Sequence, residues 1–252
     1  MGFFSRPTAP AVVKPAKISL ATAAARTFIH RFHVPGYDRG TIHTFGNTHR
    51  VETPLDADPG RLHQGLDQAE RAVRSGANEG TRLYAAIADV LTHLLNHADP
   101  RNPWVPIVVT DGMDNQSRVT DFDTQWKDKQ QLVPNARFAG EMIAQGLTAM
   151  RSVGIVCQPI VVGVGGDRQI DAVAIGALGQ AGGFPTFHIS GFDQLADLLT
   201  AEVTRLVVTD RLVGHRVGNL KVVTAHQTAR VHRFPVEYAI VMDRSGSMNA
   251  AE

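Results

Sequence analysis

Cysteine is nearly absent from this chain, and long apolar runs are missing altogether. The single cysteine, Cys157, lies in an apolar segment, which excludes a disulfide framework and disfavours a zinc site built from cysteines. No apolar run approaches the ~20 residues that are needed to span a bilayer. The N-terminus lacks the continuous apolar segment of a signal peptide, so we expect a cytoplasmic location.

A strong charge of either sign is also missing. Lys and Arg number 25 and Asp and Glu number 24, which gives a formal net charge of +1. A balance so close to zero argues against nucleic acid as a partner and against binding to a membrane surface. Hydrophobic residues make up 43% of the chain and charged residues 19%, as in a folded globular protein.

The pattern of the chain predicts one domain preceded by a short arm. Residues 1–16 contain three prolines and are predicted to form a flexible N-terminal arm. Residues 17–252 suffice for a single α/β domain. Helices are predicted over 17–32, 58–74, 81–98, 136–151, 168–181 and 192–206. Strands are predicted as a pair over 39–55 and singly over 106–112, 154–165, 184–190 and 236–243.

This alternation predicts a Rossmann-like α/β fold, with a central, mostly parallel sheet and helices on both faces. The segment 207–235 is β-prone and interrupted by glycines, and we interpret it as the connection to the last strand, 236–243. One predicted helix carries His93 and His97 a single turn apart. Without the glutamate of a metalloprotease motif, this pair favours a solvated helix end over a zinc site.

Two acidic residues each follow an apolar strand directly, Asp111 after IVVT and Asp243 after AIVM. Ligands of parallel sheets bind outside the carboxyl ends of the strands, so we expect these two side chains to meet there. Ser245 and Ser247 in DRSGSM add two hydroxyls, and Thr81, at the mouth of a helix, adds a third. These are hard oxygen donors, suited to Mg²⁺ or, alternatively, Mn²⁺ or Ca²⁺. Taken singly, each residue could instead cap a helix or form a polar turn.

Three motifs in combination resemble the metal-ligand loops of von Willebrand factor type A (vWA) domains, which have an integrin I-like fold. They are DRSGSM, GT at the start of a helix, and VVTDG. The segments TIHTFGN, VVGVGGD and LGQAGGFPTFHI agree with the same family, and the resemblance covers roughly residues 17–205 and 236–252. It implies a metal-ion-dependent adhesion site (MIDAS) formed by the five oxygen-bearing residues named above, and it implies no catalysis.

The order of the motifs departs from that of the family. There the DxSxS loop comes first, whereas here DRSGSM comes last and residues 17–32 resemble the helix that should follow it. Joining Glu252 to Lys17 would restore the usual order, so we interpret the chain as a circular permutation. Alternatively, the last strand begins a second domain that is cut short, or it is exchanged between molecules. The protein is therefore expected to be either a monomer or a strand-exchanged oligomer.

The resemblance implies a protein-binding module in which an Asp or Glu of a partner completes the shell of the metal. Contacts with the partner are expected from residues beside the ligands, namely Gly112, Met113, Asp114, Trp126, Arg244 and Gly246. Trp126, in the long polar loop 113–135, either anchors a partner or packs against the domain itself. Two alternatives stay open. One is an enzyme that uses Mg²⁺ for phosphoryl transfer, and the other is a domain with a purely structural metal.

Overall fold

The computed structural model describes residues 15–75, 80–125, 127–166, 170–208 and 235–250. Most of the predicted arm 1–16 and of the predicted connection 207–235 therefore lies outside the described residues. The connection does not begin at residue 207, because Val207 and Val208 are the last residues of a helix.

The described residues form six β-strands and six α-helices. The strands are β1 (Arg39–Phe45), β2 (His49–Asp56), β3 (Trp104–Thr110), β4 (Ile160–Val164), β5 (Thr186–Ile189) and β6 (Glu237–Asp243). The α-helices are α1 (Lys17–Phe32), α2 (Pro59–Arg74), α3 (Leu83–His97), α4 (Ala136–Ser152), α5 (Ala172–Gly182) and α6 (Leu195–Val208). Short 3₁₀ helices are η1 (Val119–Asp121), η2 (Phe192–Gln194) and η3 (Gly246–Asn249).

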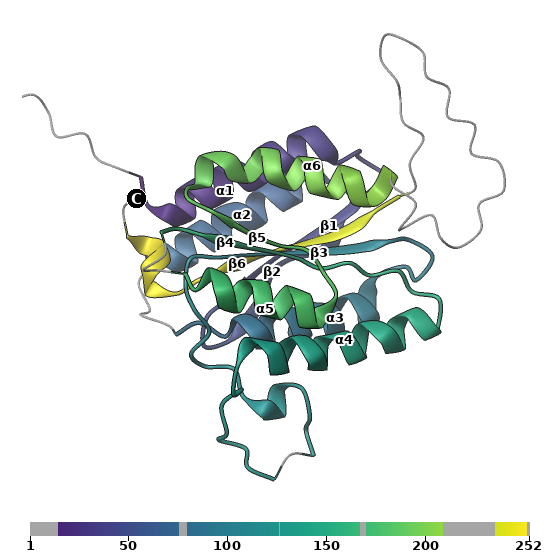
Figure 1. The fold of residues 1–252 in the computed structure, drawn as a ribbon. Coiled ribbons are helices and arrows are strands. Elements are labelled where there is room, and N and C mark those ends of the chain that lie inside the picture. Colours follow the sequence, from purple (N-terminus) through teal and green to yellow (C-terminus); the bar gives the residue numbers. More distant parts are fainter. Residues whose placement is uncertain (1–14, 76–79, 126, 167–169, 209–234, 251–252) are drawn as a thin grey trace, which may run out of the picture.

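The six strands form one sheet in the order β2-β1-β6-β3-β4-β5. Every neighbouring pair is parallel except β1 and β2, which form an antiparallel hairpin. Helices α1, α2 and α6 cover one face of the sheet, and α3, α4 and α5 cover the other (Figure 1). The predicted α/β fold, with a mostly parallel sheet between two helical layers, is confirmed.

Local sequence explains where the helices begin and end. The carboxylate of Asp58 accepts a hydrogen bond from the backbone N–H of Gly60 at 2.9 Å, and Pro59 occupies the first position of α2. Gly183 ends α5 with a φ of +70°, a left-handed conformation that favours glycine. The strand predicted over 154–165 is shorter than expected, because Pro159 has no backbone N–H to contribute and β4 begins directly after it.

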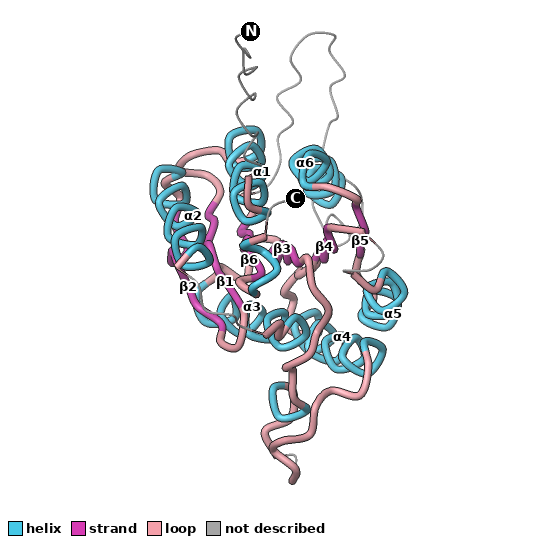
Figure 2. The backbone as a smooth tube through the Cα atoms, turned by 90° about the vertical axis from the view of Figure 1, so that its left-hand side faces the viewer, coloured by secondary structure: helices cyan, strands magenta, loops and turns pink. Residues whose placement is uncertain are grey.

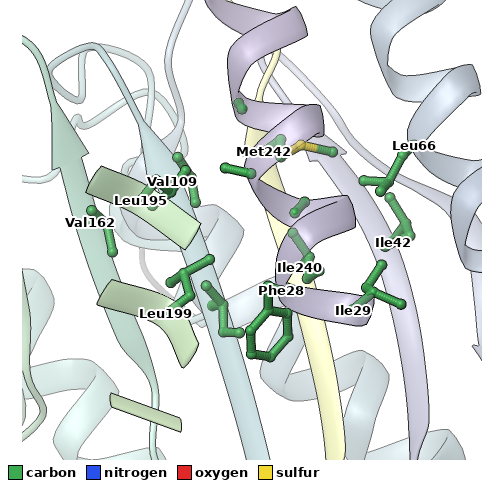
Figure 3. Packing of buried hydrophobic residues seen from close by; sticks show 14 of the residues in the cluster. Phe28, Ile29, Ile42, Leu66, Val109, Val162, Leu195, Leu199, Ile240 and Met242 are labelled. Carbon is green, nitrogen blue, oxygen red and sulfur yellow. The ribbon is translucent and has the colours of Figure 1, made fainter. Parts of the chain in front are cut away.

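Strand β6 lies at the centre of the domain although it comes last in the chain. All seven of its residues are buried, and it pairs with β1 on one side and β3 on the other. Tyr238, Ile240 and Met242 belong to the core on the side of α1, where Phe28 and Ile29 lie near Ile240 (Figure 3), while Ala239 and Val241 join the core on the opposite face. A strand buried on both faces has to be apolar throughout, and the sequence EYAIVM is nearly so.

The start of β6 is held by a buried acid. Glu237 is fully buried, and its carboxylate pairs with the guanidinium of Arg39 on β1. It also accepts hydrogen bonds from the backbone N–H of Asp99 at 2.8 Å and from the side-chain amide of Asn102 at 3.0 Å. These partners satisfy a charge that would otherwise be costly to bury, and they fix the register of the central strand.

No helix among the described residues combines the length and apolar character that crossing a bilayer requires. The cytoplasmic location expected from the sequence stays a prediction.

Four imidazoles gather where β1, β2 and α3 meet. Nδ1 of the buried His43 lies 2.7 Å from Nε2 of His49, and the ring centroids of His43 and His93 are 4.6 Å apart. His97 follows, with its ring centroid 4.5 Å from that of His93. The predicted solvated helix end therefore describes the exposed His97 but not His93, whose ring packs against a buried histidine.

Burial lowers the pKa of His43 to about 2 and that of His49 to about 4, and repulsion from neighbouring charged groups adds to both effects. In the unfolded chain an imidazole titrates near pH ~6.5. Between pH ~4 and pH ~6.5 the unfolded state therefore binds protons that the folded state does not. The contribution of these histidines to the free energy of unfolding falls as the pH drops through this window.

Replacing His49 with Gln should make the stability less dependent on pH. The variant lacks one group that binds a proton in the unfolded state but not in the folded state, and it keeps a polar group beside His43. Each such group changes the free energy of unfolding by up to ~1.4 kcal/mol per pH unit. Urea unfolding at pH 4.5, 5.5, 6.5 and 7.5 measures the slope of the free energy of unfolding against pH. The exposed His30→Gln is the matched control, and equal slopes in both variants would contradict the assignment.

Candidate metal centre

The carboxyl ends of β3 and β6 bring the first oxygens together. Val109 lies opposite Met242 in the parallel ladder, so the residues that follow them, Thr110 and Asp243, are neighbours. Thr110 Oγ1 donates a hydrogen bond to Asp243 Oδ2 at 2.7 Å, and both residues are fully buried. Asp111 follows directly and is also buried. The sheet thus places both predicted carboxylates at one edge.

The turn after β6 adds two hydroxyls. The backbone N–H of Ser245 donates to Asp243 Oδ1 at 2.7 Å, which turns the chain back over the end of the strand. Ser245 Oγ lies 2.8 Å from Ser247 Oγ, which in turn donates to Asp111 Oδ1 at 2.7 Å. Hydrogen bonds therefore connect both serines with both aspartates. Ser247 is exposed, so solvent reaches this side of the cluster.

Thr81 reaches the same place from the loop before α3. It is buried, and its backbone N–H donates to the side-chain oxygen of Asn115 at 2.9 Å. Gly112 reveals the convergence. A Cβ placed on this glycine would lie 3.0 Å from Thr81 Oγ1, 3.6 Å from Asp243 Oδ2 and 3.9 Å from Ser247 Oγ. Oxygens from two segments far apart in the sequence thus approach one point, which a side chain at position 112 would fill.

An ammonium group enters the cluster from the first turn of α1. Lys17 Nζ lies 2.8 Å from Asp111 Oδ2, and the two side chains are only 6% and 0% exposed. The backbone N–H of Lys17 also donates to the carbonyl of Ala250 at 3.0 Å. The start of α1 is therefore fixed against the end of η3, as Figure 1 shows at the purple and yellow ends of the chain.

Burial dominates the electrostatics of the cluster. It raises the pKa of Asp243 to about 7, an effect that hydrogen bonds from Thr110 and Ser245 oppose and the charge of Asp111 reinforces. Near neutral pH this carboxyl group is thus divided between its protonated and ionised forms. A positive charge placed beside Asp243 would favour the ionised form.

The donor set fits a hard divalent cation. Asp111 and Asp243 offer carboxylate oxygens, and Thr81, Ser245 and Ser247 offer hydroxyls, which are ligands that Mg²⁺, Mn²⁺ and Ca²⁺ accept. In the described part of the chain, no group of three or more His, Cys, Asp or Glu side chains is placed to hold a metal ion. The acids alone therefore do not complete a site, and hydroxyls and water would have to supply the other positions.

Three of the residues expected to contact a partner are accessible. Met113 is 54% exposed, and Gly112 and Gly246 are partly exposed. Gly112 borders the oxygen cluster, as the distances from its position demonstrate.

The other expected contact residues are engaged inside the domain or not described. Asp114 Oδ2 accepts a hydrogen bond from the backbone N–H of Tyr84 at 2.9 Å, which caps the first turn of α3. Arg244 is 3% exposed, and its Nη2 donates to Thr48 Oγ1 at 3.1 Å in the β1–β2 turn. Trp126 lies outside the described residues.

The sequence motifs did not identify Lys17 or Thr110 as part of the cluster. A lysine in the first turn of a helix is opposed by the helix dipole, so its presence there signals a nearby acid. Thr110 stands directly before Asp111, where its side chain points along the edge of the sheet toward the neighbouring strand. Neither role follows from the motif alone, because both depend on β3 and α1 meeting β6.

A similar fold is also found in solved structures. The chain is similar to the conserved hypothetical protein BatB from Bacteroides thetaiotaomicron, with a TM-score of 0.54 and 13% identity over 77% of this chain and 90% of BatB. It is also similar to a mutant of the PilB minor pilin from Streptococcus sanguinis, with a TM-score of 0.51 and 12% identity over 75% of this chain and 54% of the pilin. At these identities the likeness establishes the fold alone.

No protein-family model matches the chain, and no curated protein matches it.

Replacing Lys17 with Met should destabilise the protein in EDTA and enlarge its response to Mg²⁺. Loss of the ammonium leaves the buried Asp111 carboxylate without its partner, at a cost of about 3 kcal/mol. A cation that takes the place of the ammonium would recover part of this loss. Thermal unfolding in EDTA and in Mg²⁺ tests the prediction, with the exposed Lys127→Met as the control. The same Mg²⁺ response in wild type and Lys17→Met would contradict it.

Proposed function

We propose that this chain is a vWA-like domain that binds a protein partner through a divalent cation, Mg²⁺ or alternatively Mn²⁺ or Ca²⁺. The observation that carries the proposal is the convergence of oxygens around Gly112. Thr81 belongs to one segment and Asp243 and Ser247 to another, far apart in the sequence, and their oxygens approach one point. Asp111 and Ser245 are linked to them by hydrogen bonds.

The chemistry of these ligands favours binding of an acidic group. Two carboxylates balance the charge of a divalent cation only if both are ionised, and Asp111 already shares its charge with Lys17. Hydroxyl ligands are neutral, so the cation would retain positive character toward a third carboxylate. The exposure of Ser247 leaves a path to solvent on that side. A partner that presents Asp or Glu could therefore occupy a coordination position otherwise filled by water.

We also propose that the chain is a circular permutation of the vWA fold. Strand β6, which carries the DRSGSM turn, is central in the sheet, and the carbonyl of Ala250 accepts a hydrogen bond from Lys17 at the start of α1. This contact supports the permutation, because in the vWA family a helix follows the DxSxS loop. Exchange of β6 between molecules would give the same contacts within a dimer, so the oligomeric state has to be measured.

Metal binding should raise the stability of the wild type and not that of Asp243→Asn. A ligand that binds only the folded state at 100 times its dissociation constant stabilises it by ~2.7 kcal/mol. Thermal unfolding in EDTA and in millimolar Mg²⁺ or Mn²⁺, with size-exclusion chromatography of the same samples, measures the effect and the oligomeric state. Asp193→Asn, an exposed acid at η2, is the matched control. An equal rise in unfolding temperature on metal addition in Asp243→Asn and wild type would contradict the proposed site.

The phosphoryl-transfer alternative makes a different prediction. An enzyme would turn over an aryl phosphate with Mg²⁺ and lose this activity in Asp243→Asn. We expect no turnover, because Ser245 and Ser247 are hydrogen-bonded to each other and to Asp111, and the lysine of the cluster, Lys17, forms an ion pair with Asp111 rather than a contact with either serine. A continuous colorimetric assay with and without Mg²⁺ tests for this activity.

The alternative of a purely structural metal makes its own prediction. Adding free acetate would then leave the affinity of the protein for the metal unchanged.

A further inference from the structure

A polar cleft lies beside the oxygen cluster. It has a volume of about 720 Å³ and is bordered by the β1–β2 turn, the start of α3 and the loop between β3 and α4. This loop carries η1 and extends away from the helical layers (Figure 2). The cleft is lined by polar and charged side chains, so it is suited to a charged rather than an apolar group.

The residues that line the cleft are direct neighbours of residues in the candidate metal centre. Arg82, which lines the cleft, directly follows Thr81 of the oxygen cluster. The backbone of Thr81 is paired with Asn115, whose N–H donates to Thr81 O at 2.9 Å and whose side-chain oxygen accepts from Thr81 N at 2.9 Å. Gln116, the next residue, lines the cleft. A molecule bound at the oxygen cluster would therefore lie next to the cleft.

Positive charge exceeds negative charge in the cleft. Three cations, Arg82, Arg118 and Lys129, line it together with one acid, Asp121. Both carboxylate oxygens of Asp121 are already used, since Oδ1 pairs with Arg82 Nη2 at 2.7 Å and Oδ2 accepts from the backbone N–H of Arg118 at 2.7 Å. The acid thus neutralises Arg82, and among the described residues that line the cleft no acid balances the other two side-chain charges.

The two remaining cations are available to a partner. Arg118 is half-buried and Lys129 is exposed, and neither side chain forms an ion pair with another residue that the structure describes. A guanidinium held in a partly enclosed, polar cleft binds a carboxylate through paired N–H groups, and a nearby ammonium strengthens the attraction.

We propose that this cleft is the second anchor for the partner, and that the partner is a peptide segment with two acidic residues. This proposal rests on the proposed function. The first carboxylate binds the cation at the oxygen cluster, and the second binds between Arg118 and Lys129. A single acidic residue is a common feature of protein surfaces, whereas two at a fitting separation define a narrower class of sequence. The cleft therefore determines which acidic segments bind well.

The experiment uses fluorescently labelled Gly-Ser peptides that carry either one aspartate or two aspartates separated by two to five residues. Fluorescence anisotropy gives their dissociation constants for the full chain in Mg²⁺ and in EDTA. In Mg²⁺ the best two-aspartate peptide should bind about tenfold more tightly than the one-aspartate peptide, as expected for two partly screened ion pairs. The difference in affinity between the two kinds of peptide should become smaller as the salt concentration is raised.

The double variant Arg118→Gln/Lys129→Gln should abolish this advantage and leave binding of the one-aspartate peptide unchanged. Lys127→Gln/Arg137→Gln is the matched control, because it removes one lysine and one arginine that do not line the cleft. Equal thermal stability of the two double variants shows that both are folded. The control should retain the wild-type preference for two aspartates.

The outcomes separate the cleft from the metal centre. Equal affinity for the two kinds of peptide, or a preference that survives in Arg118→Gln/Lys129→Gln, overturns the cleft as second anchor and leaves the metal-dependent function standing. A preference that depends on the cleft but is the same in EDTA overturns the metal-dependent function and retains the cleft. Absence of binding by every peptide at millimolar concentration overturns both.

Discussion

Strand β6 is the element on which the rest of the domain depends. It is hydrogen-bonded on both sides and buried on both faces, and at its start the buried Glu237 forms an ion pair with Arg39. Because β1 and β3 take their register from it, the ends of these strands reach the same edge of the sheet. The position of Thr110 beside Asp243, and of the hairpin turn beside Arg244, follows from this pairing.

A buried polar cluster at the end of such a strand is costly unless each group has a partner. Here Asp243 accepts two hydrogen bonds, and Asp111 accepts one from Ser247 and one from Lys17. The cluster is therefore satisfied by the chain itself. A divalent cation would have to exchange these contacts for its own coordination, so its affinity would reflect the difference between two well-connected states rather than the filling of an empty space.

The sequence allowed the fold and the oxygen-bearing residues to be predicted because both depend on local patterns. Apolar runs such as IVVT mark buried strands, and an acid directly after one marks the edge of a sheet. Lys17 could not be assigned in this way, since its partner Asp111 is 94 residues distant. The gathering of His43, His49 and His93 likewise depends on how α3 lies across the hairpin. Contacts of this kind become visible only when the order of strands is known.

The order β2-β1-β6-β3-β4-β5 also determines which two strands border the sheet within the part of the chain that the structure describes. One border is β2, where Pro54 is exposed and Arg50 carries a charge, and where the ladder to β1 shifts register twice. The other border is β5, which is only four residues long. Proline, charge, irregular register and shortness each obstruct the addition of a foreign strand. Among the described residues, both borders thus carry features that oppose growth of the sheet by edge-to-edge pairing.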